Sequence, residues 1–112
     1  VVVKKDPILT DATEEDALEY GIDEIADQLE TTGGFAVGVD FEILPEKVKE
    51  KLERADLIIA KGMANWESFS ETDYSPIAFL TRTKCEPVAD SMGVRYDKNV
   101  AKLFEGAISI PG

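Results

Sequence analysis

Apolar and polar positions form alternating blocks along the chain, and the period inside each block predicts a strand or a helix. Short apolar runs bounded by turn residues are typical of strands, and they cover residues 1–6, 56–62, 77–83 and 99–106. Helices are indicated by apolar residues at helical spacing, by capping residues or by a closing glycine; they cover residues 13–21, 44–55, 65–71 and 86–93. Strands that alternate with helices predict a layered α/β sheet with mostly parallel strands.

Two segments call for a separate prediction of their secondary structure or burial. The sequence "IDEIADQLETTGG" (Ile22–Gly34) is compatible with a helix or with a short strand. The run "LIIA" (Leu57–Ala60) is continuously apolar and stops abruptly, which predicts a buried strand.

The charge balance narrows the possible partners. The chain has 12 basic and 23 acidic residues and a net charge of −11. Such a surface repels phosphate backbones and anionic membranes, so we expect no nucleic acid and no membrane as partner. The longest apolar runs are also too short to span a bilayer. A cytoplasmic location fits these features and the single cysteine, Cys85, which cannot form an internal disulfide.

The sequence contains no histidine, and this limits its chemistry. Ser-His and Cys-His nucleophile pairs, zinc-histidine sites and histidine acid-base catalysis are all excluded. Any reaction therefore relies on carboxylates, lysine, amides, hydroxyls or a bound metal.

The first polar cluster, "TDATEED", follows the first predicted strand, where α/β sheets bind ligands. Thr13 and Asp16 fit a capping box, and the two glutamates between them favour the positive end of a helix. Asp11 lies before the cap and is not explained in this way. Its carboxylate suits Mg²⁺ or Mn²⁺, which prefer oxygen ligands. One carboxylate is not a metal site, so further ligands have to come from elsewhere.

The second cluster, "KGMAN", follows the strand predicted at residues 56–62. Lys61 is a candidate phosphate contact, Gly62 lets the backbone approach a ligand, and Asn65 can donate from the next turn. The alternative is a solvated lysine followed by a turn glycine. If the two strands are parallel neighbours, both clusters open onto one crevice, and we expect Asp11 and Lys61 to share it.

Two motifs in this order, "PILTDATEEDA" (Pro7–Ala17) and "ADLIIAKGMANWESFSE" (Ala55–Glu71), resemble those of the damage-control phosphatase family, formerly known as domain of unknown function 89. The later "FLTRTKCEPVADSMGV" (Phe79–Val94) is similar to the family's lysine-cysteine segment. The resemblance covers essentially the whole chain. It implies a three-layer, mostly parallel Rossmann-like sheet with helices on its faces. It also implies that residues 1–112 are a partial domain, the C-terminal part of the catalytic domain.

The resemblance implies a divalent-metal-dependent phosphatase acting on small phosphomonoesters, such as sugar phosphates or related damaged metabolites. Asp11 matches the metal-binding aspartate, with Mn²⁺ or Mg²⁺ expected and Ni²⁺ or Co²⁺ as further candidates. Lys61 matches the lysine near the substrate phosphate, and Gly62 and Asn65 match the loop that follows it. Asp16 matches a recurrent acidic position that is either near the metal or only a cap.

The family pattern also differs from this chain. Its main metal pair, adjacent Asp and Asn, does not occur here, so we expect it upstream of Val1 together with a helical part. The family's usual asparagine before the metal-binding aspartate is Thr10. We therefore expect the chain alone to be inactive, and to pair with the rest of the same protein or with a second chain across an exposed sheet edge.

Two other functions are carried as alternatives. The first is a binding module that holds a phosphorylated metabolite without turning it over. The second is a carboxyl methyltransferase, a role that has been proposed within the family. The sequence shows no glycine-rich loop after the first strand of the kind that a nucleotide-like cofactor uses, which argues against the second.

Overall fold

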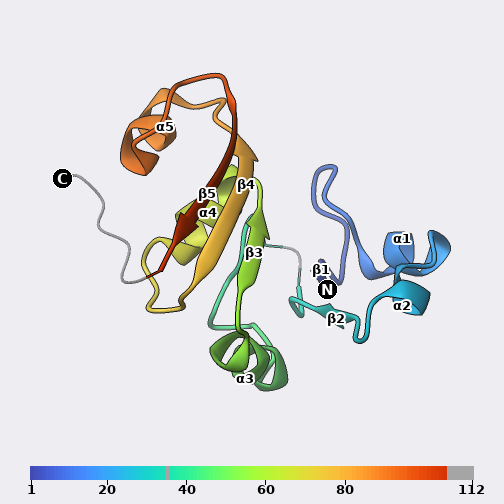
Figure 1. The fold of residues 1–112 in the computed structure, drawn as a ribbon. Coiled ribbons are helices and arrows are strands. Elements are labelled where there is room, and N and C mark those ends of the chain that lie inside the picture. The colour runs from blue at the N-terminus through green and yellow to red at the C-terminus, as the bar shows by residue number, and fades with distance from the viewer. Residues whose placement is uncertain (35, 106–112) are drawn as a thin grey trace. The chain divides into compact units, whose positions relative to one another are not determined.

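The computed structural model describes residues 1–34 and 36–105. These divide into two compact units, residues 1–51 and the part of the chain from residue 52 onward, and each unit is described by itself. Figure 1 shows the elements of both units along the chain. No helix in the described ranges is long and apolar enough to cross a membrane.

Residues 1–34 of the first unit contain two short parallel strands and two short helices. Strand β1 (Val2–Val3) pairs with β2 (Glu30–Thr31), with Val2 opposite Glu30. Helices α1 (Glu14–Glu19) and α2 (Ile22–Ile25) lie between them in sequence. The ambiguous segment 22–34 thus contains both of the structures that its sequence allows: a short helix, and then a short strand.

The predicted capping box starts α1. The backbone N–H of Asp16 donates to Oγ1 of Thr13 at 3.2 Å, and the N–H of Thr13 donates to Oδ2 of Asp16 at 3.0 Å. Each side chain thereby satisfies a backbone donor that the first turn of a helix leaves without an intrahelical partner. The role of Asp16 in this structure is that of a cap.

Helix α3 (Glu46–Arg54) follows Pro45, close to the helix predicted at 44–55. Two lysines on its first turns reach back to β2. The Nζ atoms of Lys47 and Lys51 lie 3.1 and 2.7 Å from the carboxylate oxygens of Glu30. These contacts lower the pKa of Glu30, chiefly through the bond from Lys51 and then that from Lys47.

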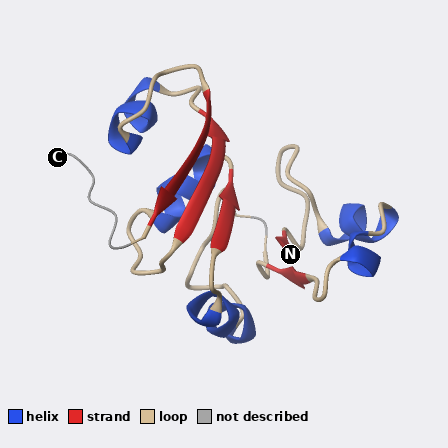
Figure 2. Cartoon of the chain, viewed as in Figure 1, coloured by secondary structure: helices blue, strands red, loops and turns tan. Residues whose placement is uncertain are grey.

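The second unit alternates strands and helices, as the sequence predicts (Figure 2). Its elements are β3 (Ile58–Lys61), α4 (Met63–Phe69), β4 (Ile77–Arg82), α5 (Glu86–Met92) and β5 (Asn99–Phe104). The strand order is β3-β4-β5; β3 and β4 are parallel, and β5 runs antiparallel to β4. The α/β class and the parallel pairing are confirmed. Gly106, the predicted end of the last strand, lies outside the described residues.

One face of this sheet is covered by helices. Trp66 of α4 packs edge-on against Phe79 of β4, with ring centroids 4.9 Å apart, and lies 5.3 Å from the ring of Phe104. Its indole N–H donates to Oγ of Ser91 on α5 at 3.0 Å. Lys102 of β5 donates to the carbonyl oxygen of Met92 at 2.6 Å, which also joins α5 to this face. Trp66 and Phe79 are 2% and 0% exposed, so they form the centre of the core.

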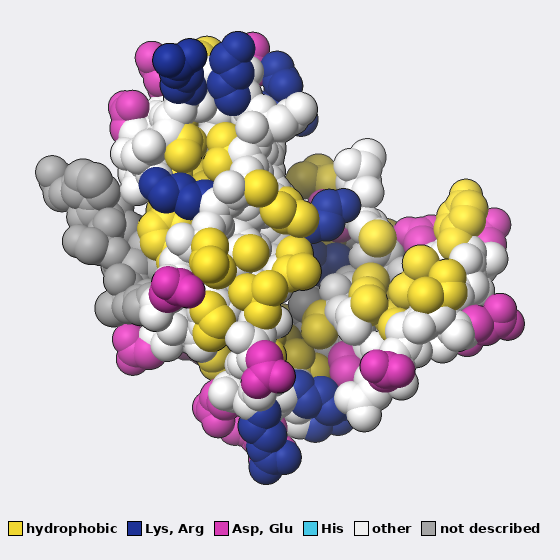
Figure 3. All heavy atoms as spheres, viewed as in Figure 1, with side chains coloured by type: hydrophobic (Ala, Val, Ile, Leu, Met, Phe, Trp, Pro, Cys, Tyr) yellow, Lys and Arg dark blue, Asp and Glu magenta, His cyan; other side chains and the backbone are white. Residues whose placement is uncertain are grey.

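The opposite face of the sheet is open. Ile58 and Ala60 are buried, but Ile59 between them is 61% exposed, and Leu80 and Leu103 are 40% and 51% exposed. Figure 3, which looks at the side opposite α4, shows apolar side chains gathered over the sheet. The run Leu57–Ala60 was predicted to form a buried strand, and this is correct for one face only. The apolar pattern does not reveal that the helices of this unit lie on one face of its sheet only.

Candidate functional site

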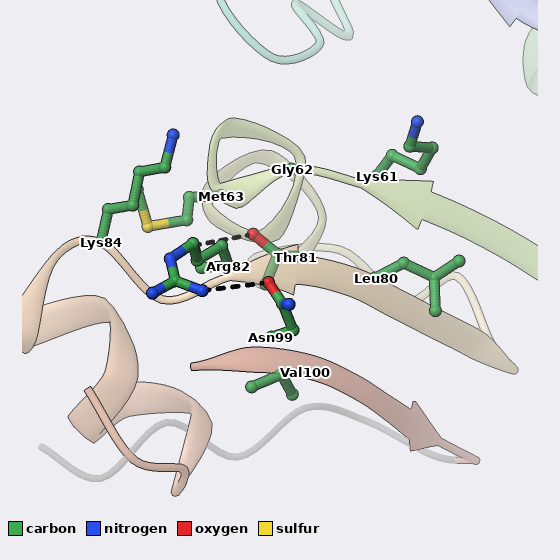
Figure 4. Close-up of a pocket in the computed structure, with 9 residues that line it drawn as sticks. All are labelled: Lys61, Gly62, Met63, Leu80, Thr81, Arg82, Lys84, Asn99 and Val100. Atoms are coloured by element: carbon green, nitrogen blue, oxygen red, sulfur yellow. Dashed lines mark hydrogen bonds between the residues drawn. The ribbon is translucent and has the colours of Figure 1, made fainter. Parts of the chain in front are cut away.

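The candidate site lies at one edge of the second unit's sheet. Because β3 and β4 are parallel, their carboxyl ends meet at the same edge, and the antiparallel β5 begins there. A hollow of about 480 Å³ opens at this edge (Figure 4). Its lining comes from all three strands, from the residues that follow β3 and β4, and from the first residue of α4: Lys61, Gly62, Met63, Leu80, Thr81, Arg82, Lys84, Asn99 and Val100.

Three basic side chains, Lys61, Arg82 and Lys84, line this hollow in a chain whose net charge is −11. All three residues are exposed. In the part of the chain that the structure describes, neither Lys61 nor Lys84 forms an ion pair. Their ammonium groups therefore have donors left for a ligand, and a phosphate group offers acceptor oxygens of the opposite charge.

Arg82 differs from the two lysines because its guanidinium is already bound. Its Nη2 lies 2.9 Å from Oδ1 of Asp97, and Nε donates to the same oxygen at 3.1 Å. Its Nη1 donates to Oδ1 of Asn99 at 3.4 Å, a contact drawn in Figure 4. The carboxylate orients the guanidinium and offsets much of its charge, so the two lysines are the basic side chains at the hollow that have no ionic partner among the described residues.

A buried threonine holds the turn that brings Asp97 to Arg82. Thr83 is 0% exposed, and its hydroxyl donates to the carbonyl oxygen of Arg95 at 2.6 Å. The hydroxyl oxygen of Thr83 also accepts from the N–H of Lys98 at 3.0 Å, and the N–H of Asp97 donates to the carbonyl of Thr83. These hydrogen bonds hold residues 95–98 against the end of β4. Lys84 is the residue after Thr83 and lies at the rim of the hollow.

Gly62 links β3 to α4 in a backbone conformation that suits glycine. Its φ and ψ are +91° and 155°, a region that residues with a Cβ rarely adopt. A Cβ built there would meet no atom within 4 Å, so space is open above this residue. Its N–H donates to the carbonyl of Leu80 at 3.0 Å, so the hydrogen bonding between the ends of β3 and β4 continues to this residue. This N–H is therefore not available to a ligand.

Asn65 lies outside the group that lines the hollow. Its side-chain Nδ2 donates to the carbonyl oxygen of Lys61 at 2.6 Å. This bond spans Gly62 and ties the first turn of α4 to the end of β3. A direct contact of Asn65 with substrate stays a prediction.

Asp11 belongs to the first unit, on a loop that starts at the end of β1. The N–H of Lys4 donates to the carbonyl of Ala12 and closes this loop at its base, and the N–H of Asp11 donates to the carbonyl of Ile8 at 3.1 Å. Leu9 in the loop has a positive φ of 50°. The carboxylate of Asp11 is exposed, as a metal ligand has to be before the ion binds.

A buried lysine lies beneath this loop. Lys4 is 8% exposed, and its Nζ donates to the carbonyl oxygen of Gly38. Burial lowers the pKa of Lys4, and the negative charge of Asp11 opposes that shift. A positive charge close to Asp11 offsets part of its negative charge while no ion is bound.

Within residues 1–34 and 36–105, no group of three or more carboxylate or cysteine side chains is placed to hold a metal ion. The described residues therefore do not complete a metal site around Asp11. Because Asp11 lies in the first unit and Lys61 in the second, their common crevice also stays a prediction. Of the predicted site residues, Lys61 and Gly62 both line the hollow.

The sequence analysis missed Thr81, Arg82, Lys84 and Asn99 as site residues. A signal was present, because "TRTK" (Thr81–Lys84) places two basic residues at the end of a second strand and just after it. The position of Asn99 had no such signal. It follows from the antiparallel register that pairs Arg82 with Asn99, and apolar patterning does not give that register.

Comparison with known proteins matches these features to one family. The family model for the damage-control phosphatase ARMT1-like domain matches residues 1–100. A damage-control phosphatase of Archaeoglobus fulgidus is 50% identical over 104 residues, which are 93% of this chain and 36% of that protein. A damage-control phosphatase of Pyrococcus horikoshii is 38% identical over 91 residues, which are 81% of this chain and 31% of that protein.

A solved structure agrees with the sequence matches. The crystal structure of a DUF89 family protein from Pyrococcus horikoshii superposes with a TM-score of 0.83 at 34% identity, and covers 95% of this chain and 36% of that one. The chain thus spans about a third of the length of the relatives it matches. With a family model that covers residues 1–100 and a fold that agrees with a solved member, this chain belongs to the damage-control phosphatase ARMT1-like domain family.

Proposed function

We propose that this chain supplies the phosphate-binding part of a metal-dependent phosphatase that hydrolyses small phosphomonoesters, sugar phosphates or related damaged metabolites. The observation that carries the proposal is the hollow at the ends of β3 and β4, where Lys61, Arg82 and Lys84 gather in an otherwise acidic chain. The two damage-control phosphatases among the relatives support the reaction class.

The roles of the basic residues follow from their contacts. Lys61 and Lys84 donate to phosphate oxygens, because their ammonium groups are exposed and form no ion pair among the described residues. Arg82 is paired with Asp97, so it contributes positioned N–H donors beside the hollow rather than a free positive charge. Open space above Gly62 leaves room for the ester oxygen to approach.

The metal is part of the proposal and not of the described site. Mn²⁺ and Mg²⁺ take oxygen ligands, typically about six, and Asp11 offers one carboxylate. The proposal therefore places the remaining ligands outside the described residues and assigns no step of the reaction to the ion. It follows that the 112-residue chain alone has little or no phosphatase activity.

Phosphate binding is the first test, because it needs no turnover. Inorganic phosphate is titrated into the chain and into its Lys61→Ala and Lys84→Ala variants by isothermal calorimetry, with Lys5→Ala as the control. Lys5 is also exposed but lies in the first unit, so it matches the change in net charge. We expect each rim variant to weaken binding by about tenfold, as the loss of a charge-assisted bond does. Equal affinities in all four proteins would refute the phosphate site.

Turnover is the second test, and it separates an enzyme from a binding module. A complete family protein containing this chain is assayed with a sugar phosphate and Mn²⁺, beside its Asp11→Ala variant and the 112-residue chain. We expect phosphate release from the complete protein only. Release by the short chain, or full activity in the variant, contradicts the proposal. Binding without release by the complete protein supports a non-catalytic module, and transfer of a methyl group to a carboxylate supports the methyltransferase.

A further inference from the structure

Asp97 brings a negative charge to the edge of a hollow whose charged lining residues are all basic. Its Oδ1 lies 2.9 Å from Nη2 of Arg82 and accepts from Nε at 3.1 Å, and its carbonyl oxygen accepts from Nη2 at 3.2 Å. Arg82 itself lines the hollow, together with Lys61 and Lys84 (Figure 4). A carboxylate beside a phosphate site repels the ligand, so its presence at this position calls for an explanation.

The stability of the fold does not supply that explanation. The side chains of Arg82 and Asp97 are 44% and 60% exposed, and ion pairs between exposed groups contribute little to stability. Asp97 also has a positive φ of 55°, which among the described residues other than glycine it shares only with Leu9. The chain therefore holds this carboxylate in an uncommon backbone conformation although the ion pair stabilises the fold only weakly.

The fold carries Asp97 to Arg82 through its backbone. The N–H of Asp97 donates to the carbonyl of Thr83 at 2.6 Å, and Thr83 is 0% exposed. Asp97 also lies two residues before Asn99, which is opposite Arg82 in the antiparallel register. The place of the carboxylate is thus set by the turn before β5 and does not depend on the ion pair alone.

This carboxylate changes the balance of charge at the hollow. Lys61, Arg82 and Lys84 each supply a positive charge, and Asp97 offsets that of Arg82. The two lysines are left, and neither forms an ion pair within residues 1–34 and 36–105. A phosphomonoester carries about two negative charges near neutral pH, and a diphosphate carries more. The remaining positive charge therefore matches a single phosphate group.

We propose that Asp97 is a specificity-determining residue, which offsets the charge of Arg82 so that the hollow accepts one phosphate group and disfavours ligands with two. The inference rests on the proposed function, because it concerns the same hollow. The Coulomb energy grows with the charge of the ligand, so a carboxylate at this edge repels a diphosphate more strongly than a monophosphate. A repulsive element of this kind discriminates between ligands without a further contact to the favoured one.

Asp97→Asn tests this role because the two side chains have nearly the same shape. Asparagine tolerates a left-handed backbone, and its Oδ1 still accepts from Arg82, so the substitution removes the charge and keeps the contact. Inorganic phosphate and pyrophosphate are titrated into the chain and the variant by isothermal calorimetry, at low ionic strength and without divalent metal. Asp90→Asn is the matched control, because Asp90 on α5 is exposed and does not line the hollow.

We expect Asp97→Asn to tighten the binding of phosphate by about twofold and that of pyrophosphate by about fivefold, as the removal of one exposed charge does. Both gains should shrink at high salt, because salt screens exposed charges. Asp90→Asn should leave both affinities unchanged. The thermal midpoint, followed by circular dichroism, should be nearly the same in all three proteins.

Weaker or unchanged binding of phosphate by Asp97→Asn would overturn the inference, since Asp97 would then only hold Arg82 in place. An equal gain for the two ligands, an equal gain from Asp90→Asn, or a loss of folding in Asp97→Asn would overturn it as well. In each of these cases the unchanged chain still binds phosphate, so the proposed function stands. A chain that binds neither ligand refutes the phosphate site, and this inference with it.

Discussion

The side-chain Nδ2 of Asn65 donates to the carbonyl oxygen of Lys61 at 2.6 Å, four residues back along the chain. The bond bridges Gly62, the residue with the least usual backbone conformation at the site. It restrains the backbone of Lys61, from which the lysine side chain extends. Asn65 is thus placed to act on the position of Lys61, and this role needs no contact with the ligand.

Asn65→Ala should weaken phosphate binding by up to about fivefold, which is the effect of one lost hydrogen bond of about 1 kcal/mol. The reason is that Lys61 loses the bond that holds its backbone, while its own side chain is unchanged. Calorimetric titration with inorganic phosphate measures the effect. Ser68→Ala is the control, because it removes another side-chain bond to a carbonyl four residues earlier, that of Ala64, in the same helix. An equal loss in both variants would mean that the effect comes from α4 as a whole.

Gly62→Asn should destabilise the chain more than Gly93→Asn. Gly93, at the end of α5, has φ and ψ of 71° and 33°, a left-handed conformation that asparagine tolerates. Gly62 at φ +91° and ψ 155° is in a region that is nearly restricted to glycine, with a cost of about 1–3 kcal/mol. Urea unfolding followed by circular dichroism gives both values. Equal costs would show that the backbone at residue 62 relaxes easily.

Thr13→Ala should lower the free energy of unfolding by about 1 kcal/mol, the usual effect of losing an N-cap side chain. The substitution removes the bond from the N–H of Asp16 to the threonine hydroxyl. It also weakens the bond from the N–H of residue 13 to the Asp16 carboxylate, because the start of α1 is then less well fixed. Thr10→Ala, three residues earlier and exposed, should change the free energy of unfolding by much less. Urea unfolding measures the two variants side by side. A similar effect of both would contradict the cap.

Glu30 should make stability depend on pH in the acidic range. Its bonds with Lys51 and Lys47 lower its pKa from 4.5. A carboxyl group with a lowered pKa in the folded state stabilises the fold fully above its ordinary value, and this contribution is lost as the pH falls through the lowered one. Glu30→Gln should therefore cost stability at pH 7 and progressively less as the solution is acidified.

Urea unfolding at several pH values tests this dependence. Glu46→Gln is the control, because Glu46 is exposed and its contact with Lys49 is long, at 3.8 Å. The Glu46 variant should show little difference from the unchanged chain at any pH. A Glu30 effect that stays constant from neutral to acidic pH would show that the lost contact is not electrostatic.

The sequence predicts most elements of this fold because each carries a local signal. Thr13 and Asp16 mark the start of α1, and Pro45 precedes α3. Helix α4 was expected from Asn65 but begins at Met63, because Gly62 already turns the chain at the end of β3. Local signals do not show which faces of the sheet are covered, so the open side of Ile59 could not be predicted.

The candidate site was only partly predictable for the same reason. Lys61 and Gly62 could be found because they directly follow a strand. Arg82 and Asn99 meet through pairing across β4 and β5, and Asp97 reaches Arg82 through a turn held by the buried Thr83. Such contacts depend on register and on a loop's path, which a pattern of apolar residues does not encode.

Trp66, buried between α4 and β4, is the chain's single tryptophan. Its fluorescence therefore reports on the second unit alone, whereas backbone circular dichroism sums over both units. Two optical signals recorded in the same melt thus distinguish a chain that unfolds in one step from one in which residues 1–51 melt separately. No label or added probe is required, because the aromatic contact at the centre of the core is also the reporter.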